Sequence, residues 1–168
     1  MNSIPLKYVL DSNVFMEASR RYYPFDFAKP FWNGLLSFSK EGLLCSIDKV
    51  LYEIKEGNDE LKNWAETEYV NYFQSTKVEN VFKAYSSLVP WAQTQSQYVQ
   101  IAKDIFMEKD NADTWILAFA LATDLTVVTH EVFDPNIKKR IPIPNVCLAF
   151  DIDYCDTFEM LRRLQFSF

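Results

Sequence analysis

Short apolar segments alternate along the chain with longer stretches in which apolar residues recur every three or four positions. The short segments are rich in β-branched and aromatic residues, and each stops at residues that favour turns. This pattern is typical of buried strands. It predicts strands at residues 7–11, 43–47 and 125–129, and a further strand at 145–150.

Helical periodicity fills most of the remaining chain. One apolar face predicts an amphipathic helix over 47–56, and the residues of 111–124 are apolar nearly all round, as in a helix buried against a sheet. Trp115 and Phe119 of that helix are expected in the core, and Asp110 or Asn111 is expected to cap its first turn. Further helices are expected at 13–21, at 28–40 with Gly42 ending the helix, and as three or four helices within 59–108, the third of which Pro90 interrupts or kinks.

Strands and helices in this order predict an α/β fold, a three-layer α/β/α sandwich with a mainly parallel central sheet. The 168 residues, of which 49% are hydrophobic, suffice for a single domain over 1–168. Ligands of such folds bind at the carboxyl ends of the strands. Asp11 and Glu131 directly follow two predicted strands, so both are expected at the same edge of the sheet.

The scarcity of glycine and histidine excludes several classes of protein. Gly34, Gly42 and Gly57 cannot form a phosphate-binding loop, so a nucleotide cofactor is not expected. His130 is the single histidine, which excludes HExxH zinc chemistry. The three cysteines carry no CxxC spacing, and no apolar run is long enough to span a bilayer. These features predict a cytoplasmic protein without a membrane segment.

Four carboxylates lie where apolar segments stop or turn, and no cluster of His or Cys accompanies them. They are Asp11 after the first strand, Glu53 on the helix at 47–56, Asp113 at the start of the helix at 111–124, and Glu131 after the strand at 125–129. Oxygen ligands favour a hard cation, Mg²⁺ or Mn²⁺, and hence phosphoryl chemistry. Each acid alone is also explained as a capping, turn or surface residue. Their joint occurrence in this order favours a metal site.

The same segments resemble the motifs of the PIN domain, a metal-dependent ribonuclease fold of many prokaryotic toxins and some RNA-processing enzymes. LDSNVF resembles a strand that ends in Asp, and VLYEI resembles a helical Glu motif. ADTWILAFAL resembles an Asp that opens an alanine-rich buried helix, and VVTHE resembles a strand with a terminal Thr and an acid two positions later. The resemblance covers residues 7–150, with Glu131 where most relatives have Asp.

The resemblance implies an endoribonuclease that depends on Mg²⁺ or Mn²⁺ and leaves 5′-phosphate and 3′-hydroxyl ends. The implied catalytic metal ligands are Asp11, Glu53, Asp113 and Glu131, with Ser12, Asn13 and Thr129 orienting ligands or metal-bound waters. The resemblance favours the toxin of a toxin–antitoxin pair, with RNA as substrate and an antitoxin as protein partner, and it permits a homodimer.

A net charge of −6 argues against nucleic-acid binding over a general basic surface but allows a local basic groove. The candidate contacts to the RNA backbone are Lys138, Lys139, Arg140, Arg20 and Arg21, for which simple solvation is the alternative with equal weight. His130 is expected to be hydrogen-bonded or exposed rather than catalytic. Tyr22, Tyr23, Phe25 and Phe27 are expected to close the core rather than to stack on bases.

Other functions also fit these residues. One is a PIN-fold RNA-processing nuclease without an antitoxin, and another is a catalytically silent PIN-like binding module, which Glu131 in place of Asp favours. A phosphatase of the haloacid dehalogenase type is disfavoured, because Asn13 stands where that motif has a second Asp.

Overall fold

A parallel sheet of five strands forms the centre of the molecule in a computed structural model that describes residues 7–168. The strands follow one another in space in the order β3-β2-β1-β4-β5, and every neighbouring pair is parallel. β1 lies in the middle, and its Tyr8 pairs with Leu44 on one side and Thr126 on the other. The strands are β1 Tyr8–Leu10, β2 Leu44–Ile47, β3 Phe73–Gln74, β4 Thr126–Val128 and β5 Tyr154–Cys155.

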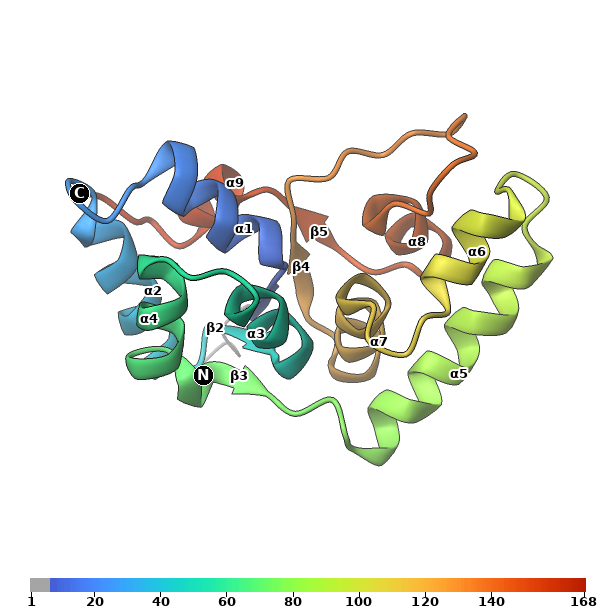
Figure 1. Cartoon of the computed structure of the whole chain (residues 1–168), viewed down its shortest axis with the longest axis horizontal. Helices are drawn as coiled ribbons and strands as arrows, with labels where there is room; N and C mark the ends of the chain where they lie inside the picture. The colour runs from blue at the N-terminus through green and yellow to red at the C-terminus, as the bar shows by residue number, and fades with distance from the viewer. Residues whose placement is uncertain (1–6) are drawn as a thin grey trace, which may run out of the picture.

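Helices cover both faces of the sheet, which is why β1 and β4 are buried at every position instead of alternating between buried and exposed residues. The helices are α1 Ser12–Glu17, α2 Lys29–Lys40, α3 Asp48–Lys55, α4 Glu60–Thr67, α5 Glu79–Thr94, α6 Gln100–Phe106, α7 Ala112–Thr123, α8 Ile143–Phe150 and α9 Thr157–Arg163. α1 continues as a π-helical turn, Ala18–Tyr22, and a 3₁₀ turn at Val70–Tyr72 precedes β3. Figure 1 shows α1, α2, α4 and α9 on one side of the strands and α5 to α8 on the other. The expected three-layer α/β/α sandwich with a parallel sheet is confirmed.

The hydrophobic core has one part on each side of the sheet. α7 is buried almost all round because it packs against α3, α5, α8 and the strands β2 and β4, and Trp115 and Phe119 are buried as expected. On the other side of the sheet, aromatic rings form the core, with Trp32 and Tyr69 each 4.8 Å from Trp64 between ring centroids. Such pairs add to the free energy of burial.

The segment at 145–150 was wrongly predicted to be a strand. It belongs to α8, which begins at Ile143 with Pro144 in its first turn. A short apolar run is compatible with either a strand or a buried helix, and proline fits the first helical turn but not a central strand. β3 and β5 were not predicted, because each has two residues and no periodicity of its own.

The helices within 59–108 are three, α4, α5 and α6, and α5 continues through Pro90 without interruption. α2 ends at Lys40, and Gly42 adopts a left-handed φ of 80°, as expected of a glycine after a helix. Ile47 ends β2 rather than starting a helix, so α3 begins one residue later than predicted.

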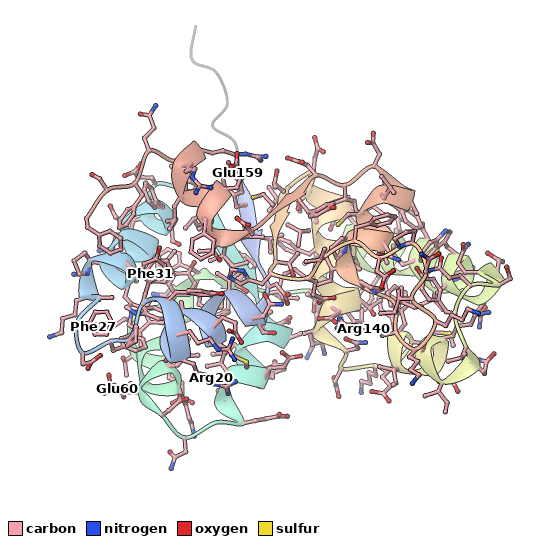
Figure 2. All side chains as sticks on the ribbon, turned by 90° about the horizontal axis from the view of Figure 1, so that it is seen from above. Arg20, Phe27, Phe31, Glu60, Arg140 and Glu159 are labelled. Carbon is pink, nitrogen blue, oxygen red and sulfur yellow. The ribbon has the colours of Figure 1, made fainter. Side chains whose placement is uncertain are left out.

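The aromatic residues after the first helix divide into two groups. Tyr23 stacks on Phe31 at 4.3 Å and Phe25 stacks on Trp32 at 4.0 Å, so these two close the core as predicted. Phe27 is 72% exposed and Tyr22 is 44% exposed, so the prediction fails for Phe27 and holds only in part for Tyr22. Phe27 points outward in Figure 2, whereas Phe31 points into the interior.

The side on which successive strands are added to the sheet changes at β1. β2 and β3 extend it from β1 to one side, whereas β4 and β5 extend it to the other. The carboxyl ends of β1 and β4 therefore form the point at which open α/β sheets bind their ligands. The three cysteines are free. Within residues 7–168, no helix combines the length and the apolar character that a membrane crossing requires.

Candidate metal centre

Asp11 lies at the carboxyl end of β1 and is 1% exposed. Its backbone N–H donates to Val128 O at 2.9 Å, which continues the pairing of β1 with β4. Its carboxylate caps α1 by accepting the Ser12 N–H at 2.8 Å, and its other oxygen accepts the Thr129 hydroxyl at 2.9 Å. The orientation of this buried carboxylate is thus set by both strands that meet at the centre of the sheet.

Thr129 connects Asp11 to Glu131. The Glu131 N–H donates to Thr129 Oγ1 at 3.1 Å, while the same hydroxyl donates to Asp11. The Glu131 carboxylate extends from the loop after β4 and accepts the Ile143 N–H at 3.2 Å from the start of α8. Oε1 of Glu131, the oxygen that accepts the Ile143 N–H, also accepts a hydrogen bond from the Arg140 guanidinium.

Asp113 reaches the same place from the first turn of α7. The side chain of Asn111, not that of Asp110, caps this helix by accepting the Asp113 N–H at 3.0 Å, and Asp110 instead pairs with Lys49 at 3.1 Å. Carboxylate oxygens of Asp11, Asp113 and Glu131 lie within 4.8 Å of one another. We call these three residues the acidic cluster.

Burial and mutual repulsion raise the pKa values of the acidic cluster. Burial is the largest cause of the raised pKa of Asp11, and the charges of Asp113 and Glu131 raise it further, whereas the bonds from Thr129 and Ser12 lower it. Burial and the charge of Glu131 raise the pKa of Asp113 to about 6. Burial also raises the pKa of Glu131, although Arg140 and the Ile143 N–H oppose this. The fully ionised cluster therefore needs a compensating cation.

Glu53 lies next to the acidic cluster but is not one of its three converging carboxylates. Its pKa is raised mainly by burial and is lowered by a hydrogen bond from the Ser12 side chain, with the charge of Asp113 raising it. Glu53 lines a cavity of about 260 Å³ together with Arg20 and Ser19. The structure thus brings together three of the four predicted ligands and places the fourth beside them.

The residues predicted to surround the ligands are all at the site. Ser12 donates its backbone N–H to Asp11, and Asn13 accepts the His130 N–H at 3.2 Å while its amide approaches Thr129 Oγ1 at 3.4 Å. His130 is hydrogen-bonded as expected, with Nε2 at 2.8 Å from Thr157 Oγ1. Burial, as the largest cause, lowers the pKa of its imidazole.

The basic candidates differ in their distance from the acidic cluster. Arg140 binds Glu131, and Lys139 lines a cavity of about 230 Å³ with Arg140 and Asp113. Arg21 pairs with Glu17 at 3.5 Å on its own helical segment. Figure 2 shows Arg20 in the half of the molecule that contains α1 and Arg140 in the half that contains α6 and α7. Lys138 is exposed.

The donor set of the acidic cluster fits a hard divalent cation. All donors are carboxylate oxygens, and one of them, Asp11, is buried and held in place by two hydrogen bonds. Such ligands suit Mg²⁺ or Mn²⁺ rather than a soft metal. Two contacts of the site were not predicted from the sequence. The Ile143 N–H belongs to the start of α8, where no element was predicted, and Arg140 was predicted as an RNA contact but not as a partner of Glu131.

Comparison with solved structures defines the class of this domain. FitAcB from Neisseria gonorrhoeae matches at 18% identity over 88% of this chain and 95% of that chain, with a TM-score of 0.52. VapBC-1 from nontypeable Haemophilus influenzae matches at 14% identity over 90% and 98%, with a TM-score of 0.55. VapBC2 from Rickettsia felis, bound to a DNA fragment from its promoter, matches at 13% identity over 90% and 98%, with a TM-score of 0.53. The chain therefore has a PIN-like fold.

The sequence also places the chain in a family. The family model described as a domain of unknown function, DUF4411, matches residues 8–168, and the chain belongs to this family. No curated protein matches the chain.

Proposed function

We propose that this protein is a metal-dependent endoribonuclease that hydrolyses RNA phosphodiester bonds, and that it acts as the toxin of a toxin–antitoxin pair. The observation that carries the proposal is the convergence of Asp11, Asp113 and Glu131 within 4.8 Å at the carboxyl ends of β1 and β4. Carboxylates that repel one another in a buried site destabilise the fold unless they serve a ligand. Mg²⁺ or Mn²⁺ is the ligand that this donor set favours.

Each residue of the site would have its own role in the reaction. A bound divalent cation would neutralise the scissile phosphate and acidify the attacking water. Asp11 is the central ligand, because Ser12 and Thr129 hold both of its oxygens. Asp113 and Glu131 complete the set from α7 and from the loop after β4. Glu53, whose pKa is raised by the charge of Asp113, would orient a water of the site rather than bind the ion directly.

The activity is tested with purified protein and single-stranded RNA in Mn²⁺ or Mg²⁺. We expect cleavage into products with 5′-phosphate ends, and loss of cleavage in chelator and in Asp11→Asn. Asp104→Asn is the matched control, since Asp104 is an exposed residue of α6 outside the acidic cluster. Cleavage that persists in Asp11→Asn would refute the assigned site.

The role as a toxin is a separate part of the proposal. It is supported by the likeness in fold to FitAcB and to two VapBC complexes, whose names describe assemblies of more than one protein. Induced expression of the wild type in bacteria should arrest growth, and Asp11→Asn should not. Normal growth with a chain that cuts RNA in vitro would instead favour an RNA-processing nuclease without an antitoxin.

A catalytically silent binding module is the second candidate. The position of Glu53 outside the three converging carboxylates favours it, because fewer ligands then reach one cation. A folded wild type that binds no Mn²⁺ would support this candidate over the nuclease.

A further inference from the structure

Arg140 is a basic residue that contacts the acidic cluster directly, through Glu131. Its guanidinium donates from Nη2 to Glu131 Oε1, and this oxygen also accepts the Ile143 N–H at 3.2 Å. The Arg140 side chain is 54% exposed, whereas that of Glu131 is 12% exposed. Arg140 thus approaches the acidic cluster from the solvent side and has room to move.

The charge of Arg140 acts on two carboxylates of the acidic cluster. It lowers the pKa of Asp113 and that of Glu131, and within residues 7–168 it is the cation that does so for both. Lys49, which also lies near α7, is paired with Asp110 at 3.1 Å and lies over the Trp115 ring. Arg140 instead contacts the acidic cluster directly, through Glu131.

Arg140 also lines two cavities, each of which includes a member of the acidic cluster. One of about 230 Å³ is lined by Asp113 and Lys139, and the other of about 300 Å³ is lined by Glu131 and the exposed Val132 and Phe133. A strand of RNA that crosses the acidic cluster from one cavity to the other would pass the guanidinium.

We propose that Arg140 is a phosphate-binding residue of the nuclease that is released for this role by the metal ion. In the metal-free protein Arg140 stays on Glu131, and when the cluster binds a divalent cation Arg140 leaves Glu131 and turns to the RNA phosphate. This inference rests on the proposed function, since it needs both a divalent cation at the cluster and an RNA substrate.

The movement of Arg140 from Glu131 to the phosphate follows from electrostatic repulsion and from the shape of the arginine side chain. A guanidinium and a divalent cation repel each other when they share a carboxylate, so binding of one weakens binding of the other. A guanidinium carries five N–H donors in a planar fork that fits phosphate oxygens, and Glu131 engages one nitrogen of that fork. Once Arg140 leaves Glu131, its whole donor fork is available for a phosphate.

The first experiment measures Mn²⁺ affinity without RNA by electron paramagnetic resonance at pH 8. Arg140→Gln should bind Mn²⁺ about two- to fivefold more tightly than the wild type, because the competing exposed ion pair is gone. Arg140→Lys keeps the charge and should lie closer to the wild type. Arg162→Gln is the matched control, because Arg162 is a 75% exposed residue of α9 and its loss changes the net charge equally.

The second experiment measures RNA affinity in two conditions. In Mn²⁺, the half-saturating concentration in single-turnover cleavage should rise about tenfold in Arg140→Gln, the loss expected for one charge-assisted hydrogen bond. The slope of log affinity against log salt should fall by about 0.7, which corresponds to one phosphate contact with a single strand. In chelator, fluorescence anisotropy should give the same RNA affinity for Arg140→Gln and Arg162→Gln, because Arg140 is then held by Glu131.

The outcomes separate this inference from the proposed function. A wild type that binds no Mn²⁺ or cuts no RNA would overturn both. A wild type that does both, with Arg140→Gln behaving as Arg162→Gln, would overturn only the role of Arg140. An equal loss of RNA affinity in Mn²⁺ and in chelator would also overturn it, because Arg140 would then bind phosphate regardless of the metal.

Discussion

Replacing Asp113 by Asn should stabilise the metal-free protein while abolishing its response to metal. Burial and the charge of Glu131 raise the pKa of Asp113 from 3.8 to about 6. Such a shift corresponds to about 3 kcal/mol of unfavourable free energy for the ionised side chain. Asparagine cannot ionise, so at pH 8 the variant should gain up to about 3 kcal/mol, or a rise in Tm of up to roughly 10 °C.

The size of this effect depends on pH. Protonated Asp113 stabilises the fold relative to the ionised form, so its contribution is complete below about pH 3.8 and is lost as the pH rises through about 6. The advantage of Asp113→Asn should therefore be largest at pH 8 and should shrink towards pH 5. Thermal unfolding in chelator at both pH values measures this difference, with Asp104→Asn as the control for the same chemical change.

Addition of Mn²⁺ should reverse the order of stability. A ligand present at 1,000 times its Kd stabilises the fold by about 4.1 kcal/mol, which exceeds the advantage of the variant, and only the wild type retains the complete acidic cluster. An Asp113→Asn variant that is less stable than the wild type in chelator at pH 8 would refute the electrostatic account. A variant that Mn²⁺ stabilises as much as the wild type would refute the ligand role of Asp113.

Three further predictions concern the same site. Thr129→Val should lower the free energy of unfolding by about 1 to 3 kcal/mol in urea titrations, because Asp11 loses a buried donor and the Glu131 N–H loses its acceptor; an unchanged free energy would show that these bonds are replaced by water. Mn²⁺ affinity measured by calorimetry should fall between pH 8 and pH 5, because the pKa of Asp113 is about 6 and protons compete with the metal; an affinity independent of pH would place the metal elsewhere. Glu53→Gln should weaken Mn²⁺ binding less than Asp11→Asn does, since Glu53 lies beside the cluster rather than in it; an equal loss would make Glu53 a full ligand.

The sequence predicted the parts of the fold that local patterns encode. β1 and β4 are largely apolar segments that Asp11 and Thr129 directly follow, and α7 is apolar nearly all round because it is buried nearly all round. Periodicity therefore predicted their type and the edge at which their acids lie. It failed at residues 145–150, where a short, largely apolar segment could be either helix or strand, and the structure has it within α8.

The geometry of the site was predictable only in part. The positions of Asp11 and Glu131 followed from strand ends, since the carboxyl ends of parallel strands meet at one edge. The convergence of Asp113 depends on how α7 packs against the sheet, and the separation of Glu53 depends on the start of α3. The hydrogen bonds of Glu131 to Arg140 and Ile143 come from an irregular loop, whose path no periodic pattern describes.

The central claim is that Asp11, Asp113 and Glu131 together bind a divalent cation. The most direct test is a titration of the metal-free protein with Mn²⁺ at pH 8, with bound and free ion distinguished by electron paramagnetic resonance. The account predicts saturable binding by the wild type and by Asp104→Asn, and loss of that binding in Asp11→Asn and Asp113→Asn. Absence of binding by the wild type, or binding that survives Asp11→Asn, would contradict it.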